Sequence, residues 1–272
     1  MLKKVLKYDF LPVYQYWWIA AVSIILLSIL SGFGLSALIS DKNYPALVEI
    51  ISGIGIFFVI LGYGAFSLFS AILVFGRFYK NFFTDEGYLT FTLPVKRSVL
   101  LNSKLILYVT TAIATSLVII FSLLLFLLIG SSDIPLSINS IIESLCYLPE
   151  EIKPYLLIYI PELIVFSLLN TVLSCLCIFC CITIACIIAK KRQILAAIGI
   201  YYGANIAYSM IFRSIGQLIA DPFYYHVSYM TQKEIYGFLA LIGLGIIFFT
   251  LLFCILLYAL ECWLLNDKLN LE

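Results

Sequence analysis

Six long runs without a single Asp, Glu, Lys or Arg divide the sequence. They cover residues 10–40, 50–76, 105–132, 163–189, 193–212 and 235–260. A hydrocarbon core of about 30 Å needs about 20 helical residues, so each run is long enough to cross a bilayer once. Transmembrane strands would alternate apolar and polar residues over about ten positions, and these runs do not. Because helices satisfy every backbone polar group within lipid, we expect an all-α membrane protein with six transmembrane helices in one domain.

The composition excludes several other classes of protein. Of the 272 residues, 64% are hydrophobic and 11% are charged, against roughly 45–50% and about 25% in ordinary soluble domains. Polar side chains are therefore too few to cover a water-soluble globule. The formal net charge of +1 excludes a nucleic-acid binder that works by phosphate neutralisation, which needs a basic excess. The first uncharged run exceeds a signal-peptide h-region of about 7–15 residues, so we expect no cleaved signal peptide.

The basic residues predict the orientation of the chain. With the N-terminus in the cytoplasm, six spans return the C-terminus to the same side, which then holds 12 of the 16 Lys and Arg residues. Nine of the 15 acidic residues fall on the outer side. Since an excess of Lys and Arg marks cytoplasmic loops, both termini are expected to be cytoplasmic.

Three segments outside the spans carry structural expectations. Residues 1–14 have apolar residues at three-to-four-residue steps, which predicts an interfacial "elbow" helix lying in the headgroup plane. Pro12 should end this helix, because the residue before a proline avoids the helical region. Residues 131–155 should form an outer loop. Residues 213–234 form an outer, partly apolar segment that is expected to dip back toward the membrane.

The sequence contains few residues or motifs that are typical of a catalytic site. The sequence has one histidine, His226, in an expected outer loop, and it lacks the G-x-x-x-x-G-K-[ST] loop of nucleotide hydrolases. Five of the eight cysteines crowd the fourth span, where thiols act as small apolar residues, with a metal cluster as the alternative. We therefore expect no catalytic, cofactor or metal residues in this chain.

Ionisable and weakly polar residues at membrane depth are candidates for a substrate path. Glu162 is the main one, but after Pro161 it also suits the first turn of a helix, where an acid complements the helix dipole. Small polar residues on one face of the fourth span suit either helix packing or an amphiphile path. Both interpretations stay open. The candidates are Glu162, Ser167, Asn170, Thr171 and Ser174, together with Asn205 in the fifth span.

The segment 77–104, RFYKNFFTDEGYLTFTLPVKRSVLLNSK, is too long for a simple turn between neighbouring spans. Thr84 can cap a helix that has acids in its first turn. Gly87 permits a sharp turn, and Pro94 breaks the chain again. Aromatic side chains lie here among five cations and two acids. The segment is either a basic loop with interfacial aromatics or a docking element for a cytoplasmic partner, since aromatic and Arg anchors carry such contacts.

At this segment the sequence resembles the permease subunits of type-2 ATP-binding-cassette transporters, particularly an exporter branch common in Firmicutes. The resemblance is carried by an acid–Gly pair, a Leu-Pro-Val motif, a basic pair and a lysine at the start of the third span. Lys190, Lys191 and Arg192 between the fourth and fifth spans extend it. The matching residues of the segment are Glu86, Gly87, Leu93, Pro94, Val95, Lys96, Arg97 and Lys104.

The resemblance implies a multi-pass protein of the bacterial plasma membrane that pairs with a second, identical or homologous permease subunit. A separate cytoplasmic ATPase would bind ATP and Mg, and this chain would bind no cofactor. The exported substrate would be an antimicrobial peptide or a hydrophobic drug. A non-transporting membrane module that anchors or regulates a complex, and an intramembrane enzyme, are the alternatives. The residues implied to couple the ATPase are Arg77, Tyr79, Phe82, Phe83, Asp85, Glu86, Gly87, Pro94, Lys96, Arg97 and Lys104.

Overall fold

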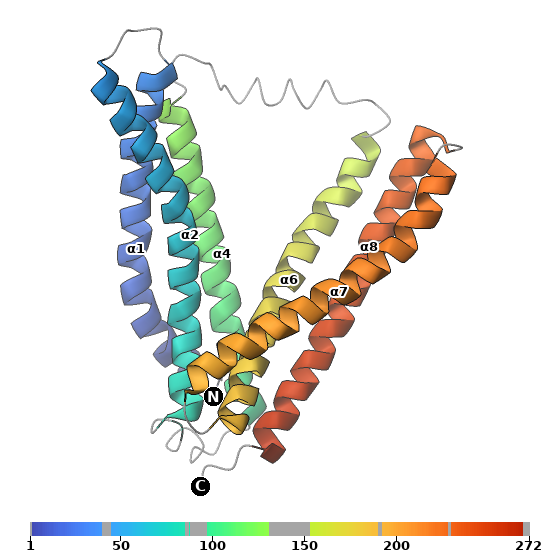
Figure 1. The fold of residues 1–272 in the computed structure, drawn as a ribbon. Helices are drawn as coiled ribbons and strands as arrows, with labels where there is room; N and C mark the ends of the chain where they lie inside the picture. Colours follow the sequence, from blue (N-terminus) through green and yellow to red (C-terminus); the bar gives the residue numbers. More distant parts are fainter. Residues whose placement is uncertain are drawn as a thin grey trace. The chain divides into compact units, whose positions relative to one another are not determined.

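The computed structural model describes residues 2–39, 45–84, 87, 97–130, 153–189, 192–227 and 230–268, and this part of the chain is helical without strands. Six of its helices contain a segment long and apolar enough to cross a membrane, which confirms the expected all-α, multi-pass membrane protein. The elements are α1 (Leu2–Ile39), α2 (Ala46–Phe83), α4 (Arg97–Gly130), α6 (Lys153–Ile188), α7 (Gln193–Val227), α8 (Gln232–Trp263) and the short π-helix η1 (Leu264–Lys268) (Figure 1).

Several helices extend beyond the uncharged runs. Because lipid thickness limits the apolar stretch and not the helix itself, backbone hydrogen bonding continues until the sequence or the packing breaks it. The expected loop 77–104 is therefore helical at both ends, as α2 continues to Phe83 and α4 begins at Arg97. The expected outer loop 131–155 ends in α6, and residues 131–152 lie outside the described part. The segment expected to re-enter over 213–234 is helical to Val227, as the last part of α7.

The break expected at Pro12 is not present. Helix α1 runs from Leu2 to Ile39 with Pro12 inside it, so residues 1–14 do not contain a separate elbow helix. Proline removes the hydrogen bond to the carbonyl of Tyr8. However, Asp9 before it and Val13 after it are both buried. Packing on both sides of Pro12 thus holds the helix together across the missing bond.

The described chain divides into two compact units, of which the first contains residues 2–78 and 102–130. Its three helices α1, α2 and α4 lie side by side (Figure 1). Trp17 of α1 packs on Phe66 of α2 and donates a hydrogen bond to Thr115 of α4, with 3.0 Å between Nε1 and Oγ1. A buried cluster of Trp17, Ala21, Ile24 and Phe66 forms its core. Trp17 of α1 therefore contacts both of the other helices in this unit.

The second unit contains residues 79–101 and 148–272, of which the described ones are the ends of α2 and α4 and the helices α6, α7 and α8 with η1. Helices α6 and α8 run parallel and are joined by hydrogen bonds near both ends. Tyr159 OH donates to the carbonyl of Tyr236 at 2.7 Å, and Thr183 OH donates to Glu261 Oε1 at 2.6 Å. Helix α6 ends at Ile188 and α7 begins at Gln193, and Arg192 directly before α7 is in the left-handed region at φ 61°.

Candidate functional site

The α2–α4 connection, residues 84–96, has both flanks anchored in the second unit. Tyr79, near the end of α2, donates its hydroxyl to Gln193 Oε1 at the first residue of α7, with 2.7 Å between the oxygens. Arg97, the first residue of α4, donates to the carbonyl oxygens of Leu265 and Asn266 in η1. The flanks of the connection are therefore tied to the start of α7 and to η1, which follows α8.

Aromatic side chains fix the end of α2. Phe82 is fully buried, and the ring of Phe83 lies 6.3 Å from Phe82 and 6.1 Å from Tyr79 between centroids. Thr84 Oγ1 donates to the carbonyl of Lys80 at 2.6 Å, which satisfies one of the terminal carbonyls of the helix. The structure thus brings together Tyr79, Phe82 and Phe83, which the sequence had singled out.

Gly87 occupies a place that admits no side chain. Its N–H donates to the carbonyl of Thr84 at 2.7 Å, and a Cβ at this position would lie 2.8 Å from the carbonyl oxygen of Phe82. Close backbone approach, not a positive φ, is therefore the reason for the glycine. Asp85, Glu86, Pro94 and Lys96 of the expected coupling set lie outside the described residues.

Lys104 is buried inside the first unit. It is 2% exposed and forms an ion pair with Asp9 of α1, which is 4% exposed. Sequence reasoning missed Asp9, although it shares a helix face with Leu6 and Val13 and a lone acid on an apolar face signals a buried partner. Arg77, the other coupling candidate of this unit, has its Nε buried without a partner among the described residues.

The weakly polar face of α6 is present, but its hydroxyls are used within the helix. Ser167 and Asn170 are exposed, and Thr171 and Ser174 are half-buried. Each hydroxyl donates to a carbonyl three or four residues earlier, at 2.8–2.9 Å. Asn205 of α7 is exposed, and its amide donates to its own helix at Tyr201. Within the described part of the chain, no hydrogen bond joins Asn205 to this face.

Glu162 lies in the seam between α6 and α8. Its carboxylate sits against Gly243, where a Cβ would lie 2.6 Å from Oε2. Its Oε1 is buried and accepts no hydrogen bond from any described residue. The interpretation of Glu162 as a helix-terminus acid is wrong, because α6 begins nine residues earlier at Lys153.

A second acid, Glu261, was not expected as a site residue. It is fully buried at the end of α8, with Thr183 of α6 donating to its Oε1. The signal in the sequence was its position as the first acid after the last apolar run. The seven described cysteines are free thiols, and no three metal-ligating side chains gather in the described residues. The side chain of His226 lies outside those described.

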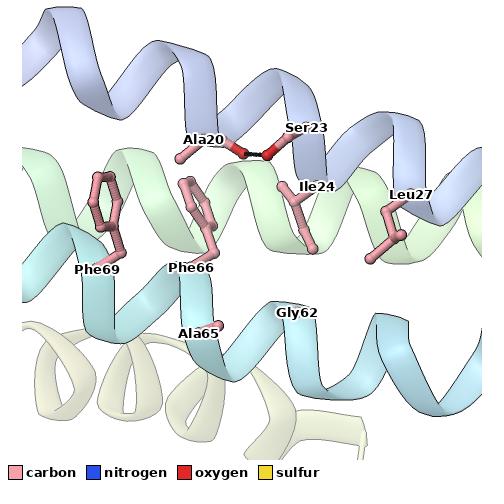
Figure 2. Close-up of a pocket in the computed structure, with 8 residues that line it drawn as sticks. All are labelled: Ala20, Ser23, Ile24, Leu27, Gly62, Ala65, Phe66 and Phe69. Atoms are coloured by element: carbon pink, nitrogen blue, oxygen red, sulfur yellow. Dashed lines mark hydrogen bonds between the residues drawn. The ribbon is translucent and has the colours of Figure 1, made fainter.

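An apolar groove of about 370 Å³ runs between α1 and α2 in the first unit. Figure 2 shows the rings of Phe66 and Phe69 pointing from α2 toward α1, and Ile24 and Leu27 pointing back from α1. The hydroxyl of Ser23 at its rim donates to the carbonyl of Ala20 at 2.8 Å. The groove therefore offers apolar contact and no free polar group for chemistry.

No protein-family model, curated protein or solved structure matches the chain. The described residues place anchored flanks around the α2–α4 connection and a carboxylate in the α6–α8 seam.

Proposed function

We propose that this chain is the membrane-spanning subunit of an ATP-binding-cassette exporter, powered by a separate ATPase that contacts the α2–α4 connection. One observation carries the proposal. The flanks of the connection belong to the second unit, whereas the longer parts of α2 and α4 belong to the first. A force on the connection therefore acts on both three-helix units at once.

The anchors suit the transmission of force. The guanidinium of Arg97 donates to two adjacent carbonyls of η1, and charge-assisted hydrogen bonds of this kind are roughly twice as strong as neutral ones. Tyr79 adds a bond to the first residue of α7. Movement of the connection would thus displace η1 and the start of α7 together.

The resemblance of the sequence supports the same assignment and suggests the rest of the complex. ATP and Mg would bind the partner ATPase, and a second permease subunit would complete the pathway in the bacterial plasma membrane. An antimicrobial peptide or a hydrophobic drug would be the substrate. Nucleotide and substrate would each have to prefer one state of the spans, because a ligand shifts an equilibrium only through differential affinity.

The test is to co-express the chain with an ATPase encoded beside its gene and to measure co-purification and substrate-stimulated hydrolysis. Glu86→Ala combined with Lys96→Ala should weaken docking. Arg97→Gln should leave the ATPase bound and lower the stimulation, with Arg213→Gln on the exposed face of α7 as the matched control. Unchanged stimulation in Arg97→Gln would show that the coupling assignment is wrong. If no ATPase co-purifies, a non-transporting membrane module is favoured.

A further inference from the structure

Glu162 is an acid inside a membrane-length helix. The membrane-length part of α6 begins at Pro154, and Glu162 lies eight residues further on, which is about 12 Å along the helix axis. Charged groups at membrane depth are costly, and they mark pathways or paired sites. Among the described residues, no Lys, Arg or His forms an ion pair with Glu162. The carboxylate therefore lies in the seam with no positive partner among the described residues.

The seam is shaped to hold this carboxylate. At Gly243 any side chain would meet the carboxylate, since a Cβ would lie 2.6 Å from Oε2 and 3.3 Å from Cδ. The other oxygen, Oε1, is buried and accepts no hydrogen bond from a described group. An acceptor in this condition is costly unless a donor or a cation reaches it.

Three half-buried tyrosines lie in the same seam on the N-terminal side of Glu162. Tyr159 is one turn from Glu162, whereas Tyr155 lies one turn further away, and Tyr236 of α8 contacts both tyrosines. The ring of Tyr155 lies 6.4 Å from that of Tyr159 and 5.9 Å from that of Tyr236 between centroids. Tyr155 OH donates to the carbonyl of Lys233 at 3.2 Å, and Tyr159 OH donates to the carbonyl of Tyr236 at 2.7 Å. The hydroxyls of Tyr155 and Tyr159 are thus turned to the backbone of α8, and the three rings form one cluster.

A carboxylate one turn from an aromatic ring favours a positive organic group. Ring faces attract cations, with organic ammonium groups a known use, and the buried Oε1 supplies the opposite charge. A divalent metal fits less well, because no three metal-ligating side chains gather in the described residues. Leu163 and Ile164 next to the acid are exposed large hydrophobic residues, which suits an attached alkyl chain.

We propose that Glu162, with the ring of Tyr159 one helical turn away, binds the ammonium group of a cationic amphiphile. This assignment deepens the proposed transport function by giving the charge of the substrate class. The binding step itself requires only this chain.

The experiment measures binding of tritiated dodecyltrimethylammonium to the purified full chain in lipid nanodiscs, with the neutral dodecanol as a competitor. We expect Glu162→Gln to weaken binding by about tenfold or more, in line with the loss of an attractive charge in a partly buried site. Glu49→Gln, which removes an exposed acid from the first turn of α2, should change it less than about twofold. Dodecanol should not displace the probe. Equal binding by wild type and Glu162→Gln, or equal loss in both variants, would overturn the assignment.

A second pair of variants tests the site with the acid still present. Gly243→Ala places a methyl group against the carboxylate and should weaken binding, whereas Gly245→Ala meets nothing within 4 Å and should not. Equal behaviour of these two variants would also count against the site. If the probe binds as expected and no ATPase co-purifies, the site stands and the transporter proposal fails. If an ATPase is coupled and the probe does not bind, only the ammonium site fails.

Discussion

Asp9 of α1 and Lys104 of α4 form an ion pair that is almost completely shielded from solvent. Ser103 adds a hydrogen bond to Asp9 Oδ2 at 3.4 Å. The pair joins the first and third helices of its unit beside Pro12, where α1 lacks a backbone hydrogen bond. Removing one partner of such a pair is costly because it leaves the other charge buried.

Lys104→Met should therefore lower the free energy of unfolding by about 3–5 kcal/mol. The double variant Asp9→Asn with Lys104→Met should recover most of that loss, because no buried charge remains. Lys80→Met, at an exposed position of α2, should stay within about 0.5 kcal/mol of wild type. Denaturant unfolding in detergent, followed by circular dichroism, measures all three. A double variant as unstable as Lys104→Met would contradict the pairing.

Thr183 and Glu261 make the corresponding buried contact between α6 and α8. Thr183→Val removes the donor and should cost about 1–3 kcal/mol. Glu261→Gln keeps an acceptor oxygen for the threonine and should cost less than about 1 kcal/mol. The control is Thr110→Val on the exposed side of α4, whose hydroxyl donates to carbonyls of its own helix. The same unfolding measurement applies, and equal losses at Thr183 and Thr110 would argue against the contact.

Trp17 and Trp18 are adjacent but lie in opposite environments. Trp17 is 7% exposed and donates to Thr115, whereas Trp18 is 53% exposed. Trp17→Phe should lower the stability by about 1–3 kcal/mol through the lost hydrogen bond and packing. Trp18→Phe should have a small effect. Thermal unfolding of the two variants side by side distinguishes them. A lower melting temperature for Trp18→Phe than for Trp17→Phe would contradict the burial of Trp17.

Gly87→Ala should disturb the entry to the α2–α4 connection, because the new methyl group would lie 2.8 Å from a backbone oxygen. We expect a loss of about 1–3 kcal/mol from the strain and a lower substrate-stimulated ATPase rate in the proposed complex. Gly76→Ala is the matched control, since nothing lies within 4 Å of its Cβ position. Its higher helix propensity should make it neutral or slightly stabilising. Equal stability of the two variants would contradict the close approach at Gly87.

The number of spans followed from the sequence because a charge-free run of sufficient length has one stable arrangement in lipid. Helix ends did not follow in the same way. Phe78 and Phe82 are fully buried beyond the charge at Arg77, and their burial depends on helices distant in sequence. Pro12 shows the same limit, since local preference predicted a break there and tertiary packing overrides it.

The sequence identified single candidate residues, but not the residues that they contact. Glu162 stood out as an acid near an apolar run, but its contact with Gly243 joins residues 81 positions apart. Asp9 and Lys104 are separated by 95 positions, and a single sequence holds no information on such pairs. Residue type indicated which groups were costly to bury, and the fold decided which partners they met.

The seam between α6 and α8 constrains how this part of the protein can move. Its hydrogen bonds run from Tyr155 near one end to Thr183 near the other, a distance of about 42 Å along α6. Sliding one helix past the other by a single turn would break all of them together. We therefore expect the two helices to tilt or rotate together rather than to slide past each other.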